Sequence, residues 1–245
     1  MLFRSSETDY AFLLESADGG EKIAKYSTIG CNPFSGFKCK GSNVEISNKE
    51  GITHIETTDP FKALEQQISK FSPVHVNGLP DFFGGAVGYT SYDSVRYVET
   101  LPDSTIDDLN LPDMYFMFYD ETIVFDHLNK TIKVVCAAHI DERDIQDVYE
   151  DAVNKIDNVI NKLRTPVMTL SDDITEKGEL SLKFSSNFKE SDFLQAVETC
   201  KEYIRAGDII QAVLSQRLKT EINAEPINIY RTLRVINPSP YMFYI

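Results

Sequence analysis

The sequence predicts an α+β protein with large, mainly antiparallel sheets and helices packed outside them. Short apolar and aromatic runs follow one another, separated by glycine, asparagine and aspartate, which is typical of a meander of strands. Helical periodicity is confined to a few separate segments. The regular alternation of strand and helix that marks a parallel sheet is absent from the sequence.

The composition limits the classes of function. The chain has 245 residues, of which 42% are hydrophobic and 25% charged, enough for one large domain or two modest ones. A net charge of −14 argues against a nucleic-acid partner, because such a surface needs clustered lysine and arginine. No apolar run has the length of a signal peptide or a membrane span, so we predict a cytoplasmic protein with no membrane contact.

The cysteines do not indicate a metal site. Four of them stand far apart in the chain, without a CxxC pair or a histidine at ligand spacing: Cys31, Cys39, Cys136 and Cys200. Isolated thiols suit a reducing compartment, in agreement with a cytoplasmic protein.

The first part of the chain reads as strands with one helix. Strands are expected at 10–16 and 25–30, and a meander over 35–57 with strands near 44–46 and 52–55. Asp59 is a suitable N-cap and Pro60 a suitable first residue for a helix that runs to about residue 71.

Residues 82–89 are apolar but rich in glycine. We interpret them as a strand with a bulge or a close backbone approach rather than a phosphate-binding loop, because neither a Lys-Ser/Thr pair nor a helix signal follows. The polar segment 93–112 is expected to be a surface excursion. Three consecutive strands should follow at 114–119, 123–125 and 131–136.

Apolar residues recur at helical spacing over 140–163, and the charged remainder of that helix is expected to face solvent. The polar segment 164–180 is the best candidate for a boundary between two lobes. A short strand is expected at 182–184. A helix is expected before Gly207, which should end it. Another helix is expected over 228–236.

From Ile209 the period changes to two, which predicts a strand with Gln211, Val213, Ser215 and Arg217 on one side. That side is either a solvated sheet face or the floor of a cleft. The apolar run 241–245 indicates a last strand. Because the chain stops inside this run, we expect the sequence to be part of a longer one.

Several long segments occur in an order that resembles the anthranilate synthase component I family. They are Leu13-Leu-Glu-Ser16 with 26–30, the glycine-rich 84–89 with Tyr92-Asp93, 112–114 with 124–127, 203–217, and Asn237-Pro-Ser-Pro-Tyr-Met-Phe243. The resemblance covers nearly the whole chain and is to the N-terminal half of such proteins. It implies a sandwich of two sheets facing each other across the substrate cleft, incomplete in this fragment.

The resemblance also implies a function. Region 1–165 would be regulatory and bind tryptophan, and 180–245 would begin a chorismate-binding region, truncated here. Members are lyases that convert chorismate and glutamine-derived ammonia, delivered by a glutamine amidotransferase subunit (component II), to anthranilate and pyruvate with bound Mg²⁺. The family's catalytic and Mg²⁺-binding residues lie mostly in the other half, so we assign none here and expect the isolated chain to be inactive.

Feedback inhibition by L-tryptophan is the second implication. The family binds tryptophan between the segments that correspond to 13–16 and 237–243. The matching residues are Glu15, Ser16, Lys25, Pro240, Tyr241 and Met242. We expect Leu13, Leu14 and Phe243 to be ordinary core residues.

Gln211 matches a position where relatives that add water to chorismate carry a lysine base. An amide cannot take up a proton at neutral pH, which suits ammonia as the nucleophile if Gln211 faces the cleft. The alternative is that Gln211 only hydrogen-bonds within its sheet.

Two other functions are compatible with the sequence. Aminodeoxychorismate synthase component I, of the folate pathway, shares 203–217 and the glycine-rich segment. However, Glu15-Ser16 and Tyr241-Met242 look more like anthranilate synthase. A stand-alone, non-catalytic tryptophan-binding module is the other alternative.

Overall fold

The structure is a computed structural model that describes residues 10–16, 25–140, 142–165 and 182–245. The chain divides into two compact units. The first comprises residues 1–170 together with 233–245, and the second comprises 171–232. The predicted boundary segment 164–180 lies mostly outside the described residues.

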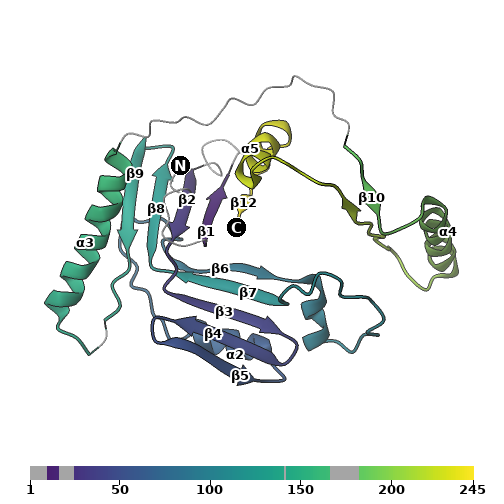
Figure 1. Ribbon diagram of the computed structural model, residues 1–245, viewed down its shortest axis with the longest axis horizontal. Helices are drawn as coiled ribbons and strands as arrows, with labels where there is room; N and C mark the ends of the chain where they lie inside the picture. The colour runs from purple at the N-terminus through teal and green to yellow at the C-terminus, as the bar shows by residue number, and fades with distance from the viewer. Residues whose placement is uncertain (1–9, 17–24, 141, 166–181) are drawn as a thin grey trace. The chain divides into compact units, whose positions relative to one another are not determined.

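The first unit contains two antiparallel five-stranded sheets, whose strands cross at a large angle in Figure 1. The first sheet has the order β12-β1-β2-β8-β9, with bounds Met242–Tyr244, Ala11–Glu15, Tyr26–Cys31, Glu121–Asp126 and Thr131–Cys136. The second has the order β5-β4-β3-β7-β6, with bounds Gly51–Glu56, Asn43–Asn48, Ser35–Lys40, Met114–Tyr119 and Gly85–Thr90. The predicted α+β class with mainly antiparallel sheets is confirmed.

Aromatic contacts join the two sheets. Phe12 of β1 is fully buried, and its ring centroid lies 4.8 Å from that of Tyr119 on β7 in an edge-to-face arrangement. A Cβ atom on Gly30 would lie only 2.1 Å from the Phe12 ring. Glycine at position 30 therefore makes room for the largest buried side chain of β1.

The second sheet packs on helix α2 (Pro60–Ile68). Leu64 of this helix joins a buried cluster with Phe37, Cys39, Val44, Met114 and Phe118 from the sheet. The helix begins as predicted: the side chain of Asp59 accepts a hydrogen bond from Lys62 N at 3.0 Å, and Pro60 is its first residue.

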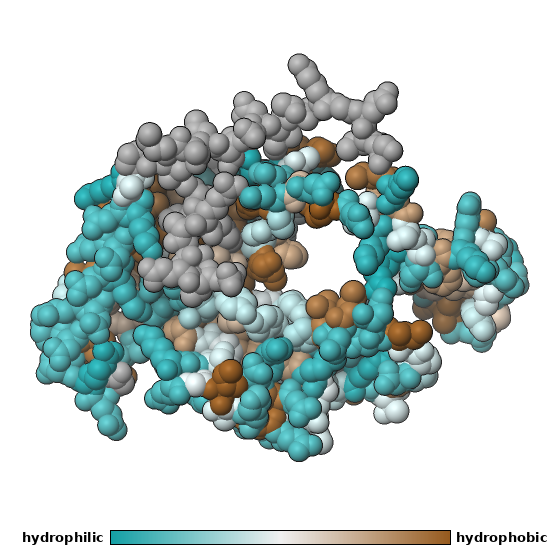
Figure 2. Space-filling view, viewed as in Figure 1, coloured by the Kyte–Doolittle hydropathy of each residue, from teal (hydrophilic) through white to brown (hydrophobic). Residues whose placement is uncertain are grey.

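Helix α3 (Ile145–Arg164) lies against β9 of the first sheet (Figure 1). It begins five residues later than the predicted start, because Asp144 caps it by accepting a hydrogen bond from Gln146 N at 2.8 Å. Figure 2 shows a mostly hydrophilic surface over this helix, at the left of the view. Val148 is its buried residue, so the charged remainder faces solvent as predicted.

Strand β6 is the glycine-rich segment of the sequence. It pairs with β7 in a register that puts Gly88 opposite Phe116. A Cβ atom at Gly88 would lie 1.9 Å from the Tyr115 carbonyl oxygen. The prediction of a strand with a close backbone approach is therefore confirmed.

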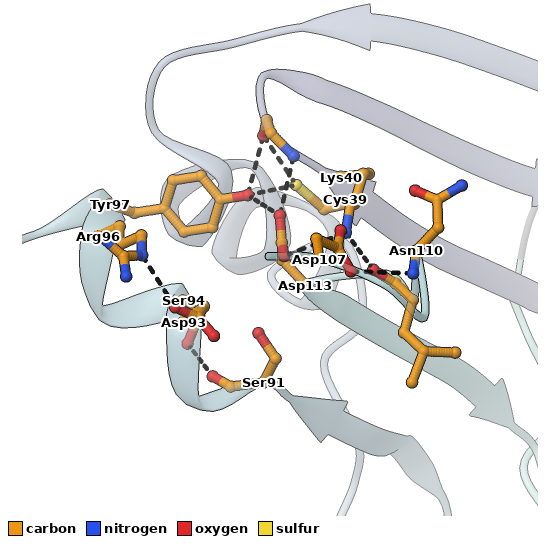
Figure 3. A network of polar contacts seen from close by, with 12 residues as sticks. Cys39, Lys40, Ser91, Asp93, Ser94, Arg96, Tyr97, Asp107, Asn110 and Asp113 are labelled. Atoms are coloured by element: carbon orange, nitrogen blue, oxygen red, sulfur yellow. Dashed lines mark hydrogen bonds and ion pairs between the residues drawn. The ribbon is translucent and has the colours of Figure 1, made fainter. Parts of the chain in front are cut away.

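The excursion between β6 and β7 begins with the 3-10 helix η2 (Tyr92–Tyr97) and is held to the β3–β4 turn by a polar network (Figure 3). The Tyr97 hydroxyl donates to Asp113 Oδ2 at 2.6 Å, and Gly41 N donates to the same oxygen at 2.9 Å. Lys40 Nζ donates to the carboxylate of Asp107. The excursion is exposed, as predicted, but attached at several points.

Acid stability should depend on Asp126 at the end of β8. Hydrogen bonds from the backbone and side chain of Asn129, and a contact with Lys133, lower the pKa of Asp126 to about 2. Because this folded pKa is below the unfolded value of about 3.9, the stabilisation is complete above about pH 4 and is lost as the pH falls toward 2.

The free energy of unfolding of the 245-residue chain, measured with urea, should therefore fall more steeply between about pH 4 and pH 2 than that of Asp126→Asn. Asp103→Asn, in the exposed excursion, is the control and should follow the wild type. Identical slopes for the wild type and Asp126→Asn would contradict this assignment.

The second unit contains helix α4 (Glu190–Ala206), the short pair β10 (Ser185–Ser186) and β11 (Leu218–Lys219), and most of α5 (Pro226–Ile236). Gly207 ends α4 in the left-handed conformation with φ 83°, as predicted. The strand predicted at 182–184 is misplaced, because the observed strand β10 covers the next two residues instead.

The predicted strand from Ile209 to Arg217 is also wrong. These residues form no strand, and Ile210 is 96% exposed. A strand needs a hydrogen-bonded neighbour, and within the described residues this region pairs only through the two residues of β11 with β10. Helix α4 likewise has no buried residue in the part of the chain that the structure describes.

Candidate regulatory site

The two segments expected to bind tryptophan lie side by side in the first sheet. Strand β1 pairs with β12 so that Leu13 is opposite Tyr244, Leu14 opposite Phe243 and Glu15 opposite Met242. On its other edge, β1 pairs with β2 and puts Ser27 opposite Glu15. Residues directly opposite one another present their side chains on the same face, so Glu15 lies between Met242 and Ser27.

The Glu15 carboxylate contacts Ser27 and Arg234. Its Oε1 accepts a hydrogen bond from Ser27 Oγ at 3.3 Å, and its Oε2 lies 3.3 Å from Arg234 Nε in α5. The Glu15 side chain is 14% exposed and the Arg234 side chain 48%. The ion pair thus joins a partly buried carboxylate to a guanidinium that solvent reaches.

Ser27 extends this group to His127. The Ser27 Oγ lies 2.7 Å from His127 Nε2, and Ser27 is buried. Because a hydroxyl has one proton and Ser27 donates it to Glu15, His127 Nε2 is the donor in the second contact. His127 therefore holds Ser27, which in turn orients the carboxylate of Glu15.

The remaining predicted residues surround the same end of β1. Ser16 directly follows the strand and is half-buried, and Pro240 is also half-buried. Lys25 precedes β2, with its Nζ 4.8 Å from the centroid of the Tyr26 ring. Tyr241 is 82% exposed.

The prediction for the end of the chain needs a correction. Met242 is 7% exposed and packs into the unit, whereas Phe243, expected in the core, is 64% exposed. The β1–β12 register decides this, because neighbouring residues of a strand point to opposite faces. Strand β12 is an edge strand of the first sheet, and the described residues do not cover the side chain of Phe243 on its side of that sheet.

Gln211 belongs to the other unit of the chain. Gln211 is exposed in the irregular segment of the second unit. The group includes three residues that the sequence reasoning did not assign to it: Ser27, His127 and Arg234. His127 was part of a segment that carried the resemblance, but only the strand register shows that it reaches Ser27.

Comparison with known proteins identifies the family. The sequence family described as chorismate binding enzyme matches residues 9–245. The chain belongs to the chorismate binding enzyme family. This assignment agrees with the resemblance seen in the sequence and covers both units.

Relatives of this chorismate binding enzyme chain carry a common name. The chain is 40% identical over 245 residues to anthranilate synthase component 1 of Acetivibrio thermocellus, and the match covers 99% of the chain and 49% of that protein. It is 37% identical over 236 residues to the protein of the same name from Aquifex aeolicus, covering 96% and 47%. The chain thus spans about half the length of the curated relatives it matches.

A solved structure supports the fold. The crystal structure of anthranilate synthase component I from Streptococcus pneumoniae TIGR4 superposes with a TM-score of 0.73 at 30% sequence identity. The match covers 90% of this chain and 48% of that one. The fold of this chorismate binding enzyme chain is therefore similar to that of the solved relative.

The residues described do not fit a Mg²⁺ site. Among them, no three His, Cys, Asp or Glu side chains cluster as a metal ion would require. Within the same residues, no helix is both long and apolar enough to cross a membrane.

Proposed function

We propose that this chain is the N-terminal part of an anthranilate synthase component I. This lyase would convert chorismate and ammonia to anthranilate and pyruvate, the first step of tryptophan biosynthesis. The names of the relatives, the 40% identity over nearly the whole chain and the TM-score of 0.73 support this proposal. The ammonia would come from a glutamine amidotransferase subunit, and Mg²⁺ would be bound by residues outside those described.

Within this proposal, region 1–165 carries the tryptophan site and 180–245 begins the region that binds chorismate. The observation that carries the regulatory part is the β1–β12 register, which places Glu15 opposite Met242. The Glu15 carboxylate can accept hydrogen bonds from an ammonium group. Ser16 and Lys25 offer polar groups beside it, and the exposed Tyr241 offers an aromatic surface for an indole ring next to the largely buried Met242.

Gln211 would face the chorismate cleft in the complete protein, although its segment forms no strand here. An amide there cannot act as a base toward water, so the attacking nucleophile would be neutral ammonia. The exposed position of Gln211 in the second unit is compatible with this role.

Two measurements test the proposal. Calorimetry on the 245-residue chain should detect L-tryptophan binding, and heat should be absent with D-tryptophan. The full-length enzyme should form fluorescent anthranilate from chorismate, ammonium and Mg²⁺, and L-tryptophan should inhibit it. Aminodeoxychorismate as the product would favour the folate-pathway relative, whereas tryptophan binding without turnover by the full-length protein would favour a non-catalytic module.

A further inference from the structure

The first unit contains a cavity that shares no residue with the candidate regulatory site. It has a volume of about 440 Å³, within the range of small-molecule sites. It is formed by the first half of α3 with the segment before it, the end of β9, the β4–β5 turn, Phe34 before β3, and Asp120 between β7 and β8. Its lining includes Phe34, Asp120, His139, Val148, Ala152 and Lys155. We call it the Asp120 cavity.

Asp120 is the buried charged residue of this cavity. It stands between β7 and β8, and its side chain is 4% exposed. Its Oδ2 lies 3.0 Å from Lys155 Nζ and 3.4 Å from His139 Nε2. Its Oδ1 is also buried, but no donor among the described residues forms a hydrogen bond with it. A buried carboxylate oxygen without a donor is unfavourable, so this atom is the natural place for a donor from a ligand.

The charge near Asp120 favours a cationic ligand. Burial alone would raise the pKa of the Asp120 carboxyl, but the contacts with His139 and Lys155 outweigh it and hold that pKa below its usual value. Lys155 also contacts Glu121 Oε1 at 3.3 Å. Two carboxylates thus share one ammonium group. The net charge of −14 on the chain attracts cations further.

The walls of the cavity suit an organic body rather than a bare ion. Phe34 lines it, with its ring centroid 4.6 Å from that of His139. Val148 and Ala152 of α3 add small apolar surfaces. An aromatic ring in the wall of a cavity attracts an organic cation. At the rim, the exposed Arg143 and Asp151 are paired with each other at 2.8 Å.

From this geometry we infer that the Asp120 cavity binds a small organic ammonium compound. The ammonium group donates to Asp120 Oδ1, and an apolar or aromatic body lies against Phe34 and Ala152. The inference rests on the cavity, the buried unpaired oxygen and the local charge. It does not depend on the proposed function, because none of these residues belongs to the β1–β12 group.

A pair of probes tests this inference on the 245-residue chain. 2-Phenylethylamine carries an ammonium on a phenylethyl body, and 3-phenylpropionate carries a carboxylate on the same body. Calorimetry and amide chemical shifts should show that only the amine binds, at millimolar or lower concentration, with shifts at Ala152 and His139. Asp120→Asn should weaken the amine by about tenfold or more, because a charge-assisted hydrogen bond is lost.

Two further variants separate binding from folding. Ala152→Phe fills the cavity without changing its charges and should abolish binding of the amine while circular dichroism stays unchanged. Asp151→Asn, at the rim, is the matched control for Asp120→Asn and should change the affinity less than about twofold. Equal binding of both probes, no binding of the amine at about 10 mM, or binding that survives Ala152→Phe in a folded chain would each overturn the inference.

Discussion

Gly88→Ala is expected to destabilise the first unit by about 3 kcal/mol or more, the upper part of the range for overpacked sites. The new Cβ would lie 1.9 Å from the Tyr115 carbonyl oxygen and 2.6 Å from Phe116 Cα. Both atoms belong to the backbone of β7, so no side-chain rotation relieves the clash. Strand β7 is also hydrogen-bonded to β3, and it carries Met114 and Phe118 of the core. Moving β7 would therefore disturb the whole second sheet.

Urea unfolding followed by circular dichroism measures this loss. The matched control is Gly41→Ala, at a turn where nothing lies within 4 Å of a new Cβ but φ is +57°. That substitution should cost only about 1–2 kcal/mol, the strain of a left-handed residue. Equal losses for the two variants would show that the β6–β7 register described above is incorrect.

Ser16→Phe should abolish feedback inhibition in the full-length enzyme while turnover is kept. Ser16 is half-buried directly beyond Glu15, at the end of β1 that pairs with Met242. A phenyl ring there would occupy space that the proposed function assigns to the indole. We expect the half-inhibitory tryptophan concentration to rise by about 100-fold or more, equivalent to about 2.7 kcal/mol. The kcat and KM for chorismate should stay within about twofold, because no catalytic group is altered.

Anthranilate fluorescence at increasing L-tryptophan concentrations gives both quantities. Ser42→Phe places the same side chain on the exposed β3–β4 turn and should leave inhibition unchanged. If the half-inhibitory tryptophan concentration of Ser16→Phe equals that of the wild type, Ser16 is not part of the site. Loss of inhibition together with a large loss of turnover would indicate damage to the fold instead.

Local sequence signals predicted the elements that local interactions determine. The Asp59-Pro60 start of α2 and the Gly207 end of α4 depend on one cap or one backbone conformation, so the sequence alone was sufficient for both. Strand positions in the two sheets followed from alternation and turn residues. The interpretation of the glycine-rich segment was also confirmed, because glycine in a strand indicates a close neighbour.

The candidate site was only partly predictable. The resemblance named Glu15 and Met242, but that they face each other across a strand pair is a property of register. Ser27, His127 and Arg234 join Glu15 through the same register and through α5. These residues are far apart in the chain, and no local pattern connects them. The burial of the unpaired Asp120 oxygen is likewise a tertiary property, because Asp120 lies between β7 and β8 and its partner Lys155 lies on α3.

The sequence by itself determined the fold class, most element positions and the family of this protein, because propensity, capping and long ordered motifs are properties of adjacent residues. Only the tertiary structure decided which strands pair, which face each side chain occupies and where a strand has no partner. It buried Met242 and exposed Phe243, against the expectation that Phe243 is core. It left 209–217 irregular, because alternation creates a potential strand and only a hydrogen-bonded neighbour makes it one.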